Sequence, residues 1–168
     1  MKVVIINGKG GAGKDTFVDM CRYKVNVKSI SSVDLVKKAA KVLGWNGKKD
    51  LKSRAFLSEL KDLSTKYNDG PIEYLDDIYQ TNLLIGDYDL LFMHVREPEE
   101  IQRCKEKFNA ITLLIKRPEL EDSSYGNHAD DDVMNYKYDH VVVNDGTIQD
   151  LFYKADDFLL RIFGKEYL

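Results

Sequence analysis

Residues Gly8–Thr16 read GKGGAGKDT and follow the apolar run Val3–Ile6 after one residue, Asn7. The match to the phosphate-binding pattern G-x-x-x-x-G-K-[ST] is complete through Lys14, but Asp15 stands where the pattern has a hydroxyl residue, and Thr16 comes one position later. Four glycines within six residues allow a tight turn whose main-chain N–H groups face one point. The stretch therefore predicts a strand, a phosphate-binding loop and the start of a helix.

Each part of this loop has an expected role in holding a polyphosphate. The first-turn amides and the positive end of the helix dipole attract the anion, and Lys14 is expected to reach the transferring phosphoryl group. Asp15 and Thr16 are candidate magnesium ligands, but Asp15 can equally hold an attacking group or act as a favourable first-turn acid. A glycine-rich turn can also be a plain tight connection. The candidate nucleotide-binding residues of the loop are Gly8, Gly10, Gly11, Ala12, Gly13, Lys14, Asp15 and Thr16.

Composition indicates one domain over residues 1–168 and a small ligand. The chain is long enough for a single core, and a net charge of −3 with an isoelectric point near 5.7 argues against a nucleic-acid-binding surface. With neither an apolar membrane span nor a signal segment, we expect a soluble, cytoplasmic protein, either monomer or homodimer. Cys21 and Cys104 occupy apolar positions of expected helices, which favours buried free thiols.

Hydrophobic periodicity predicts alternating strands and helices. Short strands that are apolar on both faces and alternate with helices predict a parallel sheet covered on both sides. Two consecutive helices, separated by the turn sequence Asn68–Pro71, interrupt the alternation. The expected strands are Lys2–Asn7, Val27–Ile30, Leu90–Met93, Ile111–Ile115 and Val141–Val143, and the expected helices cover about Lys14–Tyr23, Val33–Leu43, Phe56–Tyr67, Ile72–Leu83, Pro98–Phe108 and Thr147–Phe163.

Residues 117–138 do not fit this pattern and are expected to form a loop with one short helix near His128–Met134. Loops of this length in compact domains usually cover a binding site, and this one follows a strand end, where parallel sheets bind ligands. We interpret it as a lid, with a mobile solvated loop as the alternative. The last helix has a continuous apolar stripe that begins at Ile148 and is expected to be core.

Three arginines stand where a phosphoryl-transfer catalyst needs positive charge. Arg96 and Arg117 each follow a strand end, whereas Arg54 lies on the polar side of a helix whose apolar face includes Leu60 and Leu63. A planar guanidinium can hold a phosphate at two points. An arginine alone is more often a surface residue, so the place at a strand end is what favours ligand contact for two of the three.

In these residues the sequence resembles the P-loop nucleoside monophosphate kinases, and most closely the deoxynucleoside monophosphate kinase family with its G-K-D-T loop. Phosphomevalonate kinases of the animal type are similar in having Asp after the loop lysine. The similar pieces follow in the same order and span most of the chain. They are the loop, Ser32–Lys41, Ser53–Leu60, His94–Glu100, residues 128–131 and Asn144–Leu151.

The resemblance implies a three-layer α/β/α P-loop NTPase fold with a five-stranded parallel sheet, an acceptor-binding helical insertion at about 32–86 and a short lid at about 117–138. It also implies ATP with Mg²⁺ as the donor, a (deoxy)nucleoside monophosphate as the acceptor, and hence small nucleotides as the partners. The implied site residues are Lys14, Arg96 and Arg117 for catalysis, Arg117, Asn144 and Gly146 beside the loop for ATP, and Asp34, Arg54, His94 and Arg96 for the acceptor.

One departure from the family leaves the activity and acceptor open. The family often has Asp-Val-Arg where this chain has His94–Arg96, so an acidic group near the magnesium is missing. His94 either contacts the acceptor phosphate or is a packed neutral residue, and Asp34 is either an acceptor contact or a first-turn helix charge. Two alternatives therefore stay open: a nucleotide-binding protein without transferase activity, and a kinase of a non-nucleotide phosphorylated metabolite.

Overall fold

A computed structural model of the chain describes residues 1–48, 50–120 and 132–164. The chain divides into two compact units. We call Met1–Ser29 together with Gly86–Leu168 the core unit, and Ile30–Ile85 the helical unit. The two units are described separately below.

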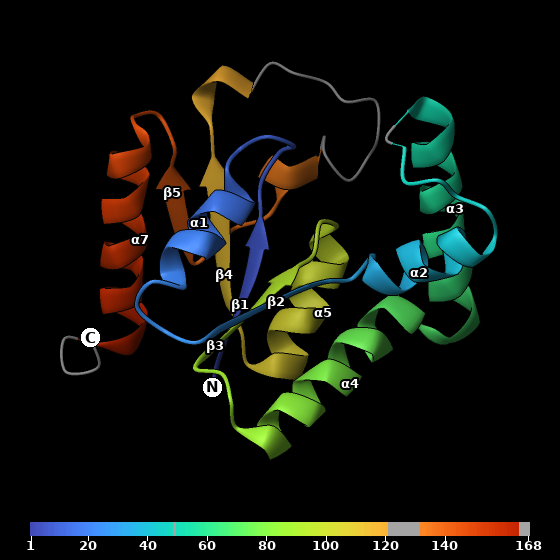
Figure 1. The fold of residues 1–168 in the computed structure, drawn as a ribbon, viewed down its shortest axis with the longest axis horizontal. Helices are drawn as coiled ribbons and strands as arrows, with labels where there is room; N and C mark the ends of the chain where they lie inside the picture. Colours follow the sequence, from blue (N-terminus) through green and yellow to red (C-terminus); the bar gives the residue numbers. More distant parts are fainter. Residues whose placement is uncertain (49, 121–131, 165–168) are drawn as a thin grey trace. The chain divides into compact units, whose positions relative to one another are not determined.

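The sheet has the strand order β2-β3-β1-β4-β5 (Figure 1). Strand β1 pairs in parallel with β3 on one side and with β4 on the other, and β4 pairs in parallel with β5. The five-stranded parallel sheet predicted from the sequence is confirmed, and its strands end at one edge. The strands are β1 Lys2–Asn7, β2 Val27–Ser31, β3 Leu90–His94, β4 Ile111–Lys116 and β5 His140–Val143.

Helices cover both faces of this sheet and make the three predicted layers (Figure 1). On one face, α1 (Lys14–Cys21) packs against α7 (Ile148–Phe163), with the rings of Phe17 and Phe158 meeting edge to face at 5.6 Å between centroids. The same core includes the β1 side chains that point to this face. Helix α5 (Pro98–Phe108) packs on the strands of the other face through the fully buried Ile101.

Local chemistry fixes where these helices begin and end. Helix α7 begins with a capping box in which Thr147 and Asp150 exchange side-chain and main-chain hydrogen bonds. Pro98 occupies the first turn of α5, where its missing N–H costs nothing, and Asn109 ends the helix in the left-handed conformation. The predicted stripe of α7 is wrong at Ile148, which is 68% exposed because it precedes the part of the helix that reaches the core.

The prediction that the strands are covered on both faces is wrong for β5. Val141 is 53% exposed, because β5 is the last strand of the sheet. The two cysteine predictions are confirmed: Cys21 and Cys104 are free thiols and both are buried. Burial also raises the pKa of Cys21 to about 12.

The helical unit contains α2 (Asp34–Val42), α3 (Leu51–Asn68) and α4 (Gly70–Ile85). Helix α3 begins five residues before the predicted start, because the carboxylate of Asp50 accepts from the N–H of Ser53 and caps a first turn that has no apolar pattern. The predicted break between the two helices shrinks to Asp69, which is left-handed with φ 57°.

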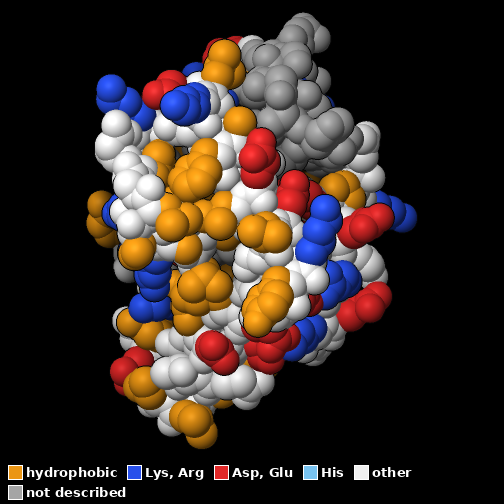
Figure 2. All heavy atoms as spheres, turned by 90° about the vertical axis from the view of Figure 1, so that its right-hand side faces the viewer, with side chains coloured by type: hydrophobic (Ala, Val, Ile, Leu, Met, Phe, Trp, Pro, Cys, Tyr) orange, Lys and Arg blue, Asp and Glu red, His pale blue; other side chains and the backbone are white. Residues whose placement is uncertain are grey.

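The apolar face predicted for α3 is not buried. Leu63 is 64% exposed and Tyr67 is 85% exposed, whereas Lys61 is the residue of this helix that is buried. Figure 2 faces the side on which α2 and α3 lie and shows hydrophobic side chains gathered on that surface. The periodicity of α3 therefore marks an open surface and not a core.

Half of the predicted lid lies outside the described residues. Its described ends are two short 3-10 helices, η1 (Pro118–Leu120) and η2 (Asp132–Asn135). Residues 121–131, with the predicted helix start at His128, lie outside the described part. Among the residues that the structure describes, no helix combines the length and apolarity needed to cross a membrane.

Candidate phosphate-binding site

The glycine loop joins β1 to α1, and two of its glycines are required by their surroundings. Gly8 has φ +149°, and a Cβ there would lie 2.4 Å from the carbonyl O of Ile115 in β4. Gly13 has φ +98°, and a Cβ there would lie 2.7 Å from Nδ2 of Asn144. Only glycine lets the loop approach both the end of β4 and the turn after β5 this closely.

Lys14 is the first residue of α1, and its ammonium group is folded back over the loop. Nζ donates to the carbonyl O of Gly8 at 2.5 Å and to that of Lys9 at 2.9 Å. The N–H of Ala12 also donates to the carbonyl O of Lys9 at 3.1 Å and closes the turn. A positive charge is thus held at a helix N-terminus, which is the arrangement that binds polyphosphates.

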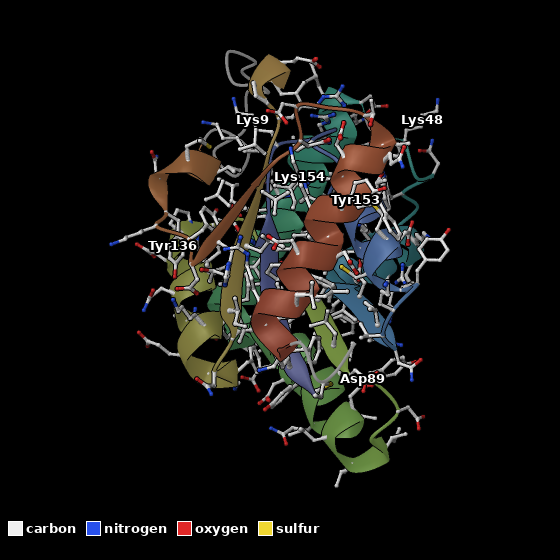
Figure 3. The ribbon with its side chains drawn as sticks, turned by 90° about the vertical axis from the view of Figure 1, so that its left-hand side faces the viewer. Lys9, Lys48, Asp89, Tyr136, Tyr153 and Lys154 are labelled. Carbon is white, nitrogen blue, oxygen red and sulfur yellow. The ribbon has the colours of Figure 1, made fainter. Side chains whose placement is uncertain are left out.

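The turn after β5 is fastened to this loop. Asn144 donates from Nδ2 to the carbonyl O of Ala12 at 2.9 Å, and its main-chain N–H donates to the carbonyl O of Lys116 at 2.7 Å. Lys154, labelled on α7 in Figure 3, donates to the carbonyl O of Val143 at 2.6 Å and to the carboxylate of Asp145 at 2.7 Å. Asn144 therefore lies between two anchored neighbours and against the loop.

The other residue assigned to this turn lies against the helix cap. A Cβ at Gly146 would lie 2.6 Å from Oδ2 of Asp150, so Gly146 makes room for the capping box of α7. The hydrogen bond from Lys154 lowers the pKa of Asp145. The turn is thus fixed on one side by the bond between Lys154 and Asp145 and on the other by the packing of Gly146 against the capping box.

Asp15 and Thr16 fit a magnesium ion that arrives with a nucleotide. Asp15 is exposed and Thr16 half-buried in the first turn of α1. Within the described ranges, no group of three His, Cys, Asp or Glu residues could hold a metal by itself. Mg²⁺ in phosphoryl-transfer sites takes one or two protein oxygens, and substrate phosphates and waters complete its shell. A carboxylate and a hydroxyl at the loop match that donor set.

Further cations lie at the carboxyl edge of the sheet. Arg117 follows β4, is half-exposed and forms an ion pair with Glu119 at 3.0 Å. Lys9, Lys116 and Arg117 line one small hollow together with Val133. This hollow has a volume of only about 10 Å³, so it marks where the glycine loop meets the end of β4 and is too small for a phosphate group.

His94 is the last residue of β3, and Arg96 lies two residues beyond it. The carbonyl O of Arg96 accepts from Nδ2 of Asn7, the last residue of β1, at 3.1 Å. Nε2 of His94 lies 3.0 Å from Oγ of Ser29, and the ring is half-buried. This contact supports the packed alternative for His94, while contact with an acceptor stays a prediction.

Two other predicted acceptor residues belong to the helical unit. Asp34 accepts from the N–H of Ser31 at 2.8 Å and lies 3.6 Å from Nζ of Lys37, so the structure gives it the bonds of a first-turn helix residue. Arg54 is exposed on α3. The acceptor role of each remains a prediction.

A groove of about 510 Å³ lies between α2 and α3 within the helical unit. Aliphatic side chains from both helices form most of its lining, with three polar residues from the end of α3 and no charged residue among them. The lining residues are Leu35, Val36, Ala39, Leu60, Leu63, Ser64, Tyr67 and Asn68.

Sequence reasoning missed Asn7, Tyr138 and Lys154. Asn7 is 1% exposed although it is polar, and it hydrogen-bonds to the hydroxyl of Tyr138 at 2.8 Å. The one signal in the sequence is the asparagine that ends the apolar run before the loop. The two groups to which its amide donates, the hydroxyl of Tyr138 and the carbonyl O of Arg96, lie far along the chain, so no local pattern identifies them.

The sequence matches no protein-family model and no curated protein. Solved structures do share the fold. They include TT1252 from Thermus thermophilus (16% identity, 97% of this chain and 98% of that chain, TM-score 0.55) and the dephospho-CoA kinase from Campylobacter jejuni (14%, 96% and 97%, 0.53). An unliganded sugar kinase from Janibacter sp. HTCC2649 is similar too (11%, 98% and 96%, 0.56).

These likenesses, together with the loop geometry, show that the chain has the three-layer α/β/α P-loop fold predicted from its sequence. One fold of this kind carries many activities, because function depends on the site built on it. The choice of substrate is therefore argued from the site.

Proposed function

We propose that the protein transfers the γ-phosphoryl group of Mg²⁺·ATP to a small phosphorylated acceptor, and that the acceptor is a (deoxy)nucleoside monophosphate. The observation that carries this proposal is the ammonium group of Lys14, held over the glycine loop by the carbonyl groups of Gly8 and Lys9. The dephospho-CoA kinase and the sugar kinase that share the fold give a second, coarser support for small-molecule phosphotransfer.

In this proposal the protein catalyses the transfer by positioning the phosphates and by placing positive charges around the transferring group. The loop amides and Lys14 hold the β- and γ-phosphates, and Arg96 and Arg117 stabilise charge on the transferring group. Mg²⁺ bound with ATP, near Asp15 and Thr16, neutralises charge between the two phosphates. The acceptor phosphate is already an anionic nucleophile, so the chain needs no general base.

The groove between α2 and α3 is the proposed place for the organic part of the acceptor. Its volume of about 510 Å³ lies within the usual range for small-molecule sites. Ser64, Tyr67 and Asn68 can offer hydrogen bonds and a ring face to a nucleobase. Arg54, exposed on the neighbouring part of α3, would hold the acceptor phosphate.

The aliphatic lining of the groove also supports the second candidate, a kinase of a non-nucleotide phosphorylated metabolite. A lining without charged residues suits an apolar body as well as a base. A third candidate, nucleotide binding without transfer, is favoured by His94. This residue hydrogen-bonds with Ser29, and the kinase family that the sequence resembles often has an acidic residue at its position.

One assay separates the three candidates. Purified protein is mixed with ATP, Mg²⁺ and each nucleoside monophosphate or phosphorylated isoprenoid precursor in turn, and ADP formation is followed. Turnover with a monophosphate supports the proposal, and turnover with the isoprenoid precursor alone supports the second candidate. ATP binding by calorimetry without any turnover supports the third.

The acceptor role of Arg54 has its own test. Arg54→Ala should raise the KM for the acceptor about tenfold with little change in the KM for ATP, because one charge-assisted contact is lost. Arg161→Ala on α7, which removes an exposed arginine paired with Asp157, is the matched control. An unchanged acceptor KM in Arg54→Ala would remove Arg54 from the site.

A further inference from the structure

A chain of hydrogen bonds runs from the segment before β5 to the ammonium group of Lys14. The hydroxyl of Tyr138 donates to the carbonyl O of Val133 at 2.9 Å and accepts from Nδ2 of Asn7 at 2.8 Å. Oδ1 of Asn7 accepts from the N–H of Gly8 at 2.8 Å, and the carbonyl O of Gly8 accepts from Nζ of Lys14 at 2.5 Å. All five residues belong to the core unit.

Asn7 is the branch point of this chain. Its side chain is 1% exposed, and its amide donates both to Tyr138 and to the carbonyl O of Arg96 while accepting from Gly8. An amide carries two N–H donors and one carbonyl, and here each has a partner. Because an unsatisfied buried polar group is costly, these partners fix the orientation of the side chain.

The hydroxyl of Tyr138 stays protonated over the whole neutral range. Burial raises the pKa of Tyr138 to about 12, against the hydrogen bond from Asn7, which lowers it. A neutral hydroxyl has one proton and two lone pairs, so it can donate to Val133 and accept from Asn7 at the same time. The direction of each bond in the chain is therefore defined.

We propose that Asn7 and Tyr138 are positioning residues that hold Lys14 and the strand end carrying Arg96 in one fixed arrangement. Neither residue touches a substrate in this proposal, which rests on the proposed function for the roles of Lys14 and Arg96. Two of the charges proposed to act on the transferring phosphoryl group, those of Lys14 and Arg96, are connected to a common buried amide, one through Gly8 and the other through its own main chain.

Loss of the Tyr138 hydroxyl would act through this amide. Nδ2 of Asn7 would lose one of its two acceptors in a buried place, and the side chain would turn toward another partner. That rotation withdraws Oδ1 from the N–H of Gly8 and lets the first turn of the loop shift. A shift of about 1 Å in a catalytic group can lower a rate by about 10².

The test compares two tyrosines of the same segment. Tyr138→Phe removes the hydroxyl of the chain. Tyr136→Phe removes a hydroxyl that donates to Oε1 of Gln102 on α5 at 2.9 Å, and it is the matched control (Tyr136 is labelled in Figure 3). We expect Tyr138→Phe to lower kcat about tenfold with the acceptor KM within about twofold, and Tyr136→Phe to leave both within about twofold.

A second variant cuts the chain at Asn7. Asn7→Asp keeps an acceptor for the N–H of Gly8 but removes both donors, and urea unfolding shows whether it folds. If both variants break the same chain, kcat of Asn7→Asp/Tyr138→Phe should lie within about twofold of Asn7→Asp alone. Multiplied effects on kcat would show independent roles and overturn the proposal.

Amide hydrogen exchange at Gly8 tests the proposal without a measurement of turnover. We expect exchange at Gly8 to be about tenfold faster in Tyr138→Phe and unchanged in Tyr136→Phe. Unchanged exchange in Tyr138→Phe overturns the proposal, as does an unchanged kcat with only a lower urea midpoint. If the wild type turns over no acceptor, the proposed function fails. Faster exchange with weaker ATP binding in Tyr138→Phe then still supports the chain, and the absence of both overturns it.

Discussion

Asn144 donates a hydrogen bond from Nδ2 to the carbonyl O of Ala12 at 2.9 Å, across a sequence separation of 132 residues. The turn after the last strand is therefore a structural part of the glycine loop near the amino end. The same side chain lies against Gly13, where a Cβ would come within 2.7 Å of Nδ2. The resemblance placed Asn144 beside ATP, and this contact shows that it also shapes the loop itself.

Asn144→Ala should weaken ATP binding by about three- to tenfold, because one partly buried hydrogen bond contributes about 1 kcal/mol. Calorimetric titration with ATP and Mg²⁺ measures the change. Gln149→Ala, which removes an exposed amide in the first turn of α7, is the control and should leave the ATP affinity unchanged. An Asn144→Ala protein with wild-type ATP affinity would show that the loop keeps its shape without this contact.

Gly13→Ala should lower the free energy of unfolding more than Gly44→Ala does. The two glycines have nearly the same φ, +98° and +95°, so both alanines suffer similar backbone strain of about 1–2 kcal/mol. Only at Gly13 does a neighbour, Asn144, lie in the way; at Gly44 nothing lies within 4 Å. Urea unfolding of both variants measures the difference.

The double variant Gly13→Ala/Asn144→Ala checks the cause. Removing the Asn144 amide should recover part of the stability lost in Gly13→Ala, because the overlap is relieved. Equal losses in Gly13→Ala and Gly44→Ala would show that backbone strain accounts for the whole effect.

Lys14→Met should lower kcat by about 10² or more while the protein stays folded. The substitution removes the positive charge and the bonds to Gly8 and Lys9 but keeps an unbranched side chain of similar length. Lys24→Met, which removes a surface lysine paired with Asp156 outside the candidate site, is the control. Circular dichroism confirms folding, and a Lys14→Met protein with appreciable turnover would contradict the role given to this lysine.

Asp139 should stabilise the protein above its normal titration range and lose that contribution in acid. Burial alone would raise the pKa of Asp139, but hydrogen bonds from Lys105 and Thr112 outweigh it and lower the pKa below 3.8. A carboxyl group whose pKa is lower in the folded protein contributes its full stabilisation at pH values above the pKa that it has in the unfolded chain. The contribution disappears as the pH falls through the native value.

Asp139→Asn tests this dependence. The wild type should exceed the variant in free energy of unfolding at pH 6, and the gap should narrow below about pH 3.8. Urea unfolding between pH 3 and 6 gives both curves. A gap that is constant with pH would mean that the charge of Asp139 adds nothing to folding.

Neither cysteine should react with iodoacetamide in the native protein at pH 8. Both thiols are buried, and burial raises the pKa of Cys21 to about 12, so the reactive thiolate is absent. Mass spectrometry should show no label in buffer and two labels in urea. Native labelling at Cys21 would show that the contact between α1 and α7 opens readily.

Several elements were predicted correctly because local physics specifies them. The apolar runs of the strands, the glycine loop and the cap at Thr147 act within a few residues, so the sequence alone indicated them. The face of α3 was misjudged because periodicity shows which side chains align, not whether anything covers them. Leu63 and Tyr67 align as core residues do and yet line an open groove.

The glycine loop, the parallel sheet and the buried cysteines were determined by the sequence itself, through glycine content, apolar runs and period. The tertiary structure decided which residues support the loop. Asn7, Tyr138, Asn144 and Lys154 reach their separate hydrogen-bond partners only when the strands align in the sheet. Hydrogen bonds between side chains and distant carbonyl groups depend on that alignment, and no local sequence pattern encodes it.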